Sequence, residues 1–308
     1  MNMLNPLVSV IIPTYKRPDM LVRAVSSVLA QTYNPIEIII VDDNGRDTEL
    51  QVCTYNVLSS ILKKDEQKIQ YFVHEVNKGG SAARNTGWKN SNGKYITFLD
   101  DDDEMSIYRI EKQVKCMETL DETWGACYTG YHKLLENGTI LKSSENSFGN
   151  VYLQTLMRTL YIGSGSNLLL RSVAVKVVDG YDESFRRNQD LEFMVRIAEK
   201  YKFAYIPEDL LTIHYEVRQF KYLDCLDDFS LFYLQKFKSR IDQLAVDDKL
   251  KVLTVISLER ARFMIMNKQY KSAIVLLFKN SVKLSICLRY VLYLINRYVK
   301  KRSYGFYY

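Results

Sequence analysis

The sequence places five acidic residues in a row, Asp100, Asp101, Asp102, Asp103 and Glu104. Because like charges at close range repel each other, such a run is unfavourable as mere structure. One interpretation is a solvated acidic loop. The other is a cation site, since carboxylate oxygens on a short turn suit Mg²⁺ or Mn²⁺, with water and substrate phosphates filling the remaining positions. Which of these two interpretations is favoured depends on where the run lies in the fold.

Two further residues could take part in chemistry. Asp190 opens a predicted helix at residues 190–201. Its carboxylate could accept a proton from a hydroxyl as a general base, or it could be a negative charge favoured at a helix N-terminus. Spacing alone favours the second role. His214 follows a predicted strand at 210–213 and could either ligate a metal or serve only the structure.

The elements that must position these residues alternate along the first 100 residues. Short apolar runs predict strands, and apolar residues repeated every three or four positions predict helices. Strands are expected at 8–12, 36–41, 69–74 and 95–99, and helices at 18–30, 48–62 and 81–90. This alternation predicts an α/β fold with a mixed, mainly parallel sheet covered by helices on both faces. Ligands of such sheets bind outside the carboxyl ends of the strands, where the acidic run lies.

The rest of the chain changes character twice. Residues 125–213 mix strand-like and helical segments. No proline follows Pro207, no glycine lies between Gly180 and Gly305, and residues 252–266 and 270–298 have helical spacing. We therefore predict a catalytic domain at 1–218, with halves at 1–104 and 105–218, and a helical C-terminal extension at 219–308.

The net charge of +6 conceals an asymmetry. The first 259 residues carry 31 basic and 36 acidic side chains, a net charge of −5, whereas residues 260–308 hold eleven basic side chains and no acid. Within this tail, residues 279–302 resemble a basic amphipathic helix that could lie on an anionic membrane. A helix that packs its apolar side on the catalytic domain is an equal alternative. No motif supports binding to nucleic acid.

Several classes of protein are disfavoured. No apolar run approaches the roughly 18 residues of a membrane-spanning helix, and the first residues lack the pattern of a secretory signal. Five widely spaced cysteines, an odd number without a Cys-x-x-Cys pair, argue against a disulfide framework and fit a reducing cytoplasm. The sequence gives no indication of the oligomeric state.

Five short motifs occur in order along the chain. They are VSVIIPTYKR at 8–17, IIVDD at 39–43, NKGGSAARN at 77–85, FLDDDD at 98–103 and GYDESFRRNQDLE at 180–192. Together they resemble the family 2 glycosyltransferases, whose fold is the GT-A nucleotide-sugar-binding fold. The resemblance covers residues 8 to about 213 and leaves the extension uncovered.

The resemblance implies a role for each matching residue. Asp102 would bind the metal, Asp190 would be the catalytic base, and His214 would be a further metal ligand or diphosphate contact. Asp43 would accept a hydrogen bond from the base of the nucleotide, and Asp100 or Asp101 would face the ribose. The implied nucleotide-sugar-binding residues are Pro13, Thr14, Tyr15, Arg17, Asp43, Arg84, Asp100 and Asp101.

The activity that the resemblance implies is an inverting, metal-dependent hexosyl transfer from a nucleoside-diphosphate sugar, with UDP as the expected nucleotide and Mn²⁺ or Mg²⁺ as cofactor. The acceptor would be a hydroxyl of a glycan or lipid-linked molecule in bacterial surface polysaccharide synthesis. The expected location is the cytoplasm, peripheral at the inner face of the plasma membrane. Two alternatives remain: a sugar-phosphate nucleotidyltransferase, disfavoured because residues 13–17 contain no glycine, and a non-catalytic membrane-associated binding protein.

Overall fold

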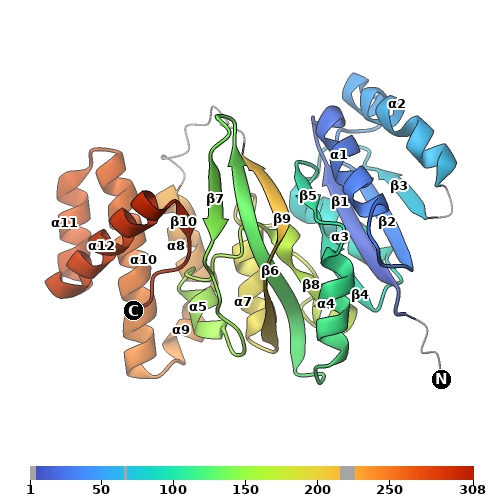
Figure 1. The fold of residues 1–308 in the computed structure, drawn as a ribbon. Helices are drawn as coiled ribbons and strands as arrows, with labels where there is room; N and C mark the ends of the chain where they lie inside the picture. The colour runs from blue at the N-terminus through green and yellow to red at the C-terminus, as the bar shows by residue number, and fades with distance from the viewer. Residues whose placement is uncertain (1–4, 66–67, 216–225) are drawn as a thin grey trace. The chain divides into compact units, whose positions relative to one another are not determined.

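The computed structural model describes residues 5–65, 68–215 and 226–308 (Figure 1). The chain divides into two compact units. The first contains the residues up to 151 together with 162–215, and the second contains 152–161 together with the residues after 215. The domain border predicted at 218 lies outside the described residues.

The first unit is built on a mixed sheet with the strand order β7-β6-β8-β4-β1-β2-β3. Its parallel part consists of β1 (Val8–Thr14), β2 (Ile36–Asp42), β3 (Ile69–Val73) and β4 (Tyr95–Phe98). In the register between β1 and β2, Thr14 lies opposite Asp42, so the polar residues that end both strands share one edge of the sheet. This confirms the predicted mainly parallel α/β sheet.

Helices cover both faces of the parallel part because its strands are apolar on both sides. The helix α1 (Pro18–Leu29) packs Leu21 and Val25 into the core with Val10 of β1. On the opposite face α3 (Gly80–Lys89) comes so close that a Cβ on Gly87 would lie 2.3 Å from Ile11. The helix α2 (Glu49–Lys64) begins after Thr48, whose side chain accepts a hydrogen bond from the Gln51 amide as an N-cap.

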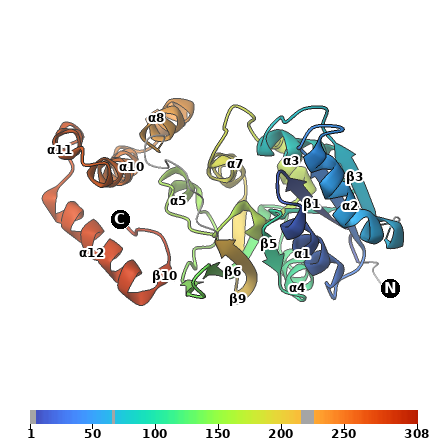
Figure 2. The ribbon, with the colours of Figure 1, turned by 90° about the horizontal axis from the view of Figure 1, so that it is seen from above.

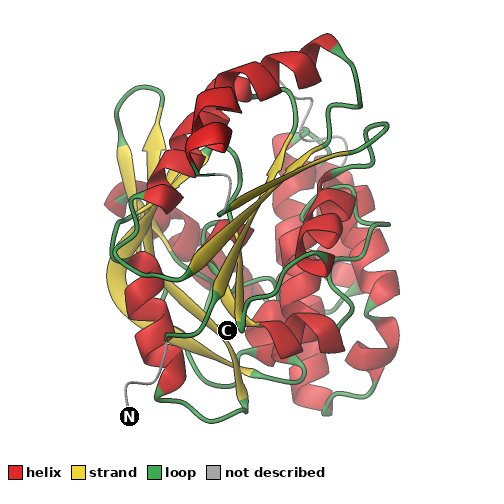
Figure 3. Ribbon diagram, turned by 90° about the vertical axis from the view of Figure 1, so that its right-hand side faces the viewer, coloured by secondary structure: helices red, strands yellow, loops and turns green. Residues whose placement is uncertain are grey.

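The second part of the sheet is mainly antiparallel. Here β8 (Leu169–Arg171) pairs with both β4 and β6 (Trp124–Leu135), and β7 (Ile140–Ser143) pairs with the end of β6. The long strand β9 (Lys202–Tyr215) runs parallel to β6, with a register shift at Pro207, where a residue without an N–H is tolerated. The strands twist relative to one another (yellow in Figure 3). The helices of this part are α4 (Arg109–Glu118), α6 (Ser172–Val177) and α7 (Gln189–Ala198).

The first four acids form the short turn expected from the sequence, closed by a hydrogen bond of 3.0 Å from the Asp103 amide to the Asp100 carbonyl oxygen, but the last two also belong to a strand. Asp103 and Glu104 begin a short strand, β5 (Asp103–Met105), which is antiparallel to β9 and places Asp103 opposite Ile213. Asp103 is buried there, at 2% exposed, and stays near the other acids: burial raises the pKa of its carboxyl group, and the charges of Asp100 and Asp102 raise it further. Pairing with a strand more than 100 residues away is what the local sequence could not reveal.

The second unit is helical. It comprises α5 (Tyr152–Leu156), α8 (Leu226–Lys236), α9 (Lys238–Asp242), α10 (Val246–Met266), α11 (Tyr270–Lys279) and α12 (Leu284–Lys300), followed by the two-residue strand β10 (Arg302–Ser303). The helical spacing predicted over 270–298 is interrupted near Ser281, which has φ +52°. Neither glycine nor proline marks this break. None of the helices described is long and apolar enough to cross a membrane.

Candidate active site

The acidic run and the segment that follows β1 hold each other in place. Thr14 Oγ1 donates a hydrogen bond of 2.8 Å to Asp101 Oδ2, and the Tyr15 amide donates to the same oxygen at 3.3 Å. Arg17 Nη1 lies 2.9 Å from Asp101 Oδ1 and also forms an ion pair with Asp102. Four of the predicted nucleotide-sugar-binding residues and the predicted metal ligand are thereby brought together at the carboxyl ends of β1 and β4. Pro13, the residue before Thr14, lies opposite Val41 of β2.

Asp43 uses its carboxylate to organise the loop between β3 and α3. It accepts hydrogen bonds from the amides of Lys78 (2.8 Å) and Gly79 (2.7 Å). The Asn77 side-chain amide donates a third hydrogen bond to this carboxylate at 3.0 Å, and His74 Nδ1 lies 2.7 Å from Asp43 Oδ1. Because Gly79 has φ +92°, the turn that presents its amide suits glycine. Asp43 thus shapes this edge of the sheet through four contacts, and its contact with a nucleotide base stays a prediction.

Arg84 joins the acidic run to the segment that carries Asp190. Its Nη2 forms an ion pair with Asp100, and its Nη1 donates a hydrogen bond of 3.0 Å to Gln189 Oε1. Its guanidinium also lies 5.4 Å from the centre of the Tyr181 ring. Since Arg84 comes from α3 and Gln189 opens α7, one side chain connects two motifs that are about 100 residues apart in the sequence.

Asp190 lies in the first turn of α7, beside this pair. The short 3₁₀ helix at Gly165–Asn167 approaches it closely, because a Cβ on Gly165 would be 3.4 Å from Asp190 Cβ. Burial raises the pKa of Asp190, and the negative charge of Asp100 raises it further, whereas Arg84 opposes both effects. A carboxyl group with a raised pKa is better suited to accept a proton than an ordinary one.

Arginines, rather than a cation alone, offset the charge of the acidic run. Arg84 pairs with Asp100, Arg17 pairs with Asp101 and Asp102, and Arg23 Nη2 donates a hydrogen bond of 2.8 Å to the Asp102 carbonyl oxygen. Burial raises the pKa of Asp101 to about 6 despite Arg17. Three of the five acids therefore face guanidinium groups, but repulsion remains: after burial, the charges of Asp100 and Asp102 still raise the pKa values of Asp101 and Asp103, and the cation expected from the sequence stays a prediction.

The carboxylates still fit a divalent cation that is bound jointly with a substrate. Within the described residues no three acidic, histidine or cysteine side chains form a set that could hold a metal by themselves. Mg²⁺ and Mn²⁺ are commonly held by one or two carboxylates plus substrate phosphates, and the role of Asp102 as such a ligand stays a prediction. His214 Nε2 lies 3.3 Å from Glu104 Oε2, so its role as a metal ligand stays a prediction.

Comparison with models of protein families identifies the family of this chain. Residues 9–179 match the model described as glycosyl transferase family 2. The chain belongs to this family. The motifs at 8–17, 39–43, 77–85 and 98–103 lie within or at the edge of the matched residues, and the helical unit after residue 215 does not.

Relatives in this family carry glycosyltransferase names. A Rickettsia conorii protein named uncharacterized glycosyltransferase RC0461 is 30% identical over 283 residues, which are 89% of this chain and 44% of that protein. A Bacillus subtilis protein named putative teichuronic acid biosynthesis glycosyltransferase TuaG is 30% identical over 65% of this chain and 75% of its own length. The chain spans about a third to just under half the length of the first rickettsial relatives it matches.

Solved structures with the GT-A fold resemble this chain. Residues 1–349 of S. aureus TarS in complex with UDP-GlcNAc give a TM-score of 0.59 at 17% identity, over 90% of this chain and 76% of that one. The mannosyltransferase PcManGT from Pyrobaculum calidifontis, in complex with GDP-Man and Mn²⁺, gives a TM-score of 0.61 at 15% identity. The match covers 96% of this chain and 81% of that one. At these identities the likeness establishes the fold of this family 2 member.

Three residues at the site were not predicted from the sequence. Gln189 accepts the hydrogen bond of Arg84, Arg23 binds the Asp102 carbonyl oxygen, and Ser166 Oγ accepts a hydrogen bond of 2.9 Å from the Asp100 amide. Each contact joins elements far apart in sequence. Only the position of Gln189 beside Asp190 could have drawn attention to it.

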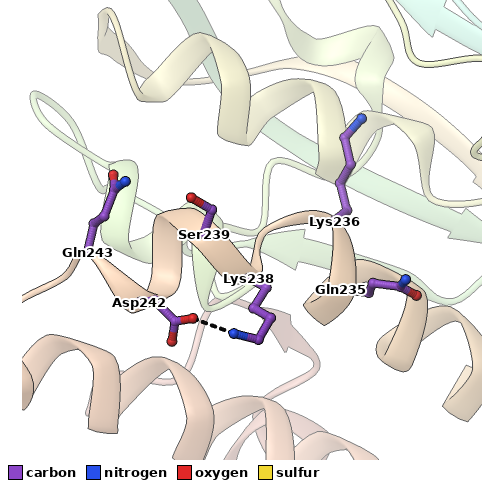
Figure 4. Close-up of a pocket in the computed structure, with 6 residues that line it drawn as sticks. All are labelled: Gln235, Lys236, Lys238, Ser239, Asp242 and Gln243. Carbon is purple, nitrogen blue, oxygen red and sulfur yellow. Dashed lines mark hydrogen bonds and ion pairs between the residues drawn. The ribbon is translucent and has the colours of Figure 1, made fainter.

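A separate surface hollow lies in the helical unit. Its volume is about 500 Å³, and it is lined by Gln235, Lys236, Lys238, Ser239, Asp242 and Gln243 of α8, α9 and the residue after α9 (Figure 4). Lys238 and Asp242 form an ion pair of 2.6 Å across one turn. None of the residues predicted for the site lines this hollow, so we assign it no role in the family 2 reaction.

Gly180 allows α3 and the segment before α7 to meet, and replacing it should destabilise the fold. It has φ +65°, and a Cβ there would lie 2.1 Å from Trp88 Nε1 and 2.5 Å from Asn85 Oδ1. Asn85 itself exchanges hydrogen bonds with the Tyr181 backbone at 2.8 and 2.9 Å. We expect Gly180→Ala to lower the free energy of unfolding by at least about 2 kcal/mol, measured by urea denaturation.

The matched control is Gly138→Ala. Gly138 also has a positive φ, +77°, but no atom lies within 4 Å of the point where a Cβ would stand. This variant should show only the conformational cost of about 1 kcal/mol. Equal destabilisation by both variants would contradict the close contact described for Gly180.

Proposed function

We propose that this chain transfers a hexose, with inversion, from a nucleoside-diphosphate sugar to a hydroxyl group of a glycan or lipid-linked acceptor. UDP is the nucleotide we favour. The observation that carries the proposal is the pairing of the two halves of the site: Arg84 joins Asp100 at the donor side to the segment of Asp190 at the acceptor side. This connection supports a donor side and a base that act together in such a transfer.

The donor side supplies positions for the nucleotide sugar. Thr14, Tyr15 and Arg17 border the acidic run and would bind the base and ribose together with Asp101. Asp102 would hold Mn²⁺ or Mg²⁺, which when bound offsets the charge of the leaving diphosphate. Arg17, which pairs with both Asp101 and Asp102, would keep its ion pair with Asp101 and border the donor.

The acceptor side supplies the base. Asp190 would take the proton of the attacking hydroxyl while the sugar is transferred. Its raised pKa supports this role. Gly165 leaves room beside it, since any side chain at that position would contact Asp190.

The name of TuaG, a putative teichuronic acid biosynthesis glycosyltransferase, supports a place in bacterial surface polysaccharide synthesis. Solved GT-A structures bind UDP-GlcNAc in TarS and GDP-Man with Mn²⁺ in PcManGT, which supports a nucleotide-sugar donor and a metal for this chain. Synthesis of such polymers on lipid-linked intermediates would place the enzyme in the cytoplasm, at the inner face of the plasma membrane.

A thermal-shift screen of UDP- and GDP-sugars tests the donor, each measured with and without Mn²⁺. A ligand at 100 times its Kd stabilises a protein by about 2.7 kcal/mol, which should raise the unfolding midpoint by about 5 °C or more. We expect one UDP-sugar to give a larger, Mn²⁺-dependent shift than the others. The stabilising donor is then assayed for release of nucleoside diphosphate, and release of pyrophosphate instead would contradict glycosyl transfer.

A further inference from the structure

The last helix, α12, is apolar on two opposite faces. One face is packed: Tyr290 and Tyr293 are at most 8% exposed and contact the ring of Phe306 at 5.2 and 5.3 Å. Arg297, on the same face, lies over the ring of Tyr161 at 4.6 Å. The second face is open to solvent, and its large apolar side chains are 50–87% exposed: Leu284, Leu288, Val291, Leu292, Ile295, Tyr298 and Val299.

The spacing of these exposed residues makes the second face a continuous stripe. They recur every three or four positions, which is the repeat of one side of a helix. A helix that needed only to pack on its own unit would expose polar residues there. The sequence left packing on the catalytic domain and membrane binding as equal alternatives; in the structure one face of α12 packs on residues of its own unit and the other is exposed.

The preceding helix α11 repeats the pattern. Its Ala273 is buried, whereas Tyr270, Ile274, Val275 and Phe278 are 55–81% exposed. These four residues also share one side of a helix. Figure 2 shows α11 and α12 following α10 at the C-terminal end of the chain. An exposed apolar stripe of this kind on a folded protein marks a binding surface.

The basic residues beside the two stripes favour an anionic partner. Basic residues flank them at both ends and between the helices, and all are exposed: Lys271, Lys279, Lys283, Arg289, Lys300, Lys301 and Arg302. No acidic residue occurs after Glu259, so no carboxylate from residues 260–308 opposes this charge. Apolar stripes on helices that carry cations and no acidic side chain match the interface of an anionic bilayer, where acyl chains and anionic head groups lie within a few ångströms of each other.

We propose that the exposed apolar stripes of α11 and α12, with the basic residues beside them, bind the surface of an anionic lipid bilayer. The helices lie in the interface and do not cross it. This inference does not depend on the sugar-transfer activity, because lipid binding is measured without substrates.

The test is co-flotation of the purified full chain with vesicles of phosphatidylcholine alone or with 30 mol% phosphatidylglycerol. We expect binding to the anionic vesicles that weakens at high salt. Changing Lys279, Lys283, Lys300 and Lys301 to Gln should lower the partition coefficient about 100-fold, since each basic residue contributes about fivefold at most. The matched control changes the exposed Lys63, Lys64, Lys89 and Lys115 to Gln and should retain binding.

A second variant, Leu288→Gln with Ile295→Gln, tests the apolar stripe without touching the packed face. It should keep the circular dichroism spectrum and lose binding to the anionic vesicles, whereas Leu50→Gln with Val52→Gln on α2 should keep both. Three outcomes would overturn the proposal: no flotation with anionic vesicles at low salt, equal flotation of all variants, or a self-associated state that the Leu288/Ile295 variant abolishes while flotation is unchanged.

Discussion

Asp190→Asn is expected to lower kcat for sugar transfer by about 100- to 10,000-fold, the usual contribution of a general base. Asparagine keeps the shape of the side chain but cannot take a proton. The affinity for the donor nucleotide should remain almost unchanged, because Asp190 belongs to α7 and the nucleotide-side contacts come from β1 and the acidic run. Initial rates at saturating donor, combined with calorimetric titration of UDP, separate the two effects.

The control is Asp179→Asn, an exposed carboxylate at a left-handed position that asparagine also adopts readily. It should retain full activity. Because the pKa of Asp190 is raised, the wild-type rate should fall as the pH drops through that value, at a higher pH than for an ordinary carboxylate. The Asn variant should lack this acidic limb, and a parallel loss of UDP affinity would instead assign Asp190 to the donor side.

Asp102→Asn should abolish transfer and remove the Mn²⁺-dependent part of UDP binding. Loss of the charged ligand deprives the leaving diphosphate of its cation, an effect worth several kcal/mol, or at least about 1,000-fold in rate. UDP affinity in the presence of Mn²⁺ should fall at least about tenfold, to the value measured in EDTA. Titration of UDP with and without Mn²⁺ checks this directly.

Asp19→Asn serves as control, since Asp19 is an exposed acid in the first turn of α1, near Arg17 in sequence. It should behave as wild type. Mn²⁺-dependent UDP binding that persists in the Asp102 variant would move the metal to another ligand. Activity that survives in both the Asp102 and the Asp190 variants would contradict the assignment of the whole site.

Patterns local in the sequence predicted the scaffold of the site well. The runs at 8–12 and 36–41 became β1 and β2, and the polar residues that end them lie at the carboxyl edge as expected. The periodic segment at 18–30 became α1. These predictions succeeded because strand and helix periodicity is set by nearest neighbours in the chain.

Predictions about charge were less successful, because the arginines that pair with the acidic run come from segments far from it in sequence. Arg17, Arg23 and Arg84 reach the acidic run from the segment before α1, from α1 and from α3, which no spacing rule connects to it. Asp103 was counted with the run and proved to be buried in β5, where pairing with β9 directs it inward. The partner of Asp190 across the site, Arg84, could be named only once the fold was known.

The ion pair between Arg158 and Glu259 joins a short segment, which lies in sequence between the two parts of the first unit, to the helices of the second. Arg158, in the 152–161 segment, is 6% exposed, 2.8 Å from Glu259 of α10 and 3.1 Å from Ser230 of α8. Glu259 is also the last acid of the sequence. Replacing Glu259 alone would leave this cation buried without its counter-charge, a loss of about 3–5 kcal/mol. The 152–161 segment belongs to the helical unit although, in sequence, it lies between the two parts of the first unit. No single cut in the chain can therefore separate the two units, because the chain passes from the first to the second and back before it reaches the final helices.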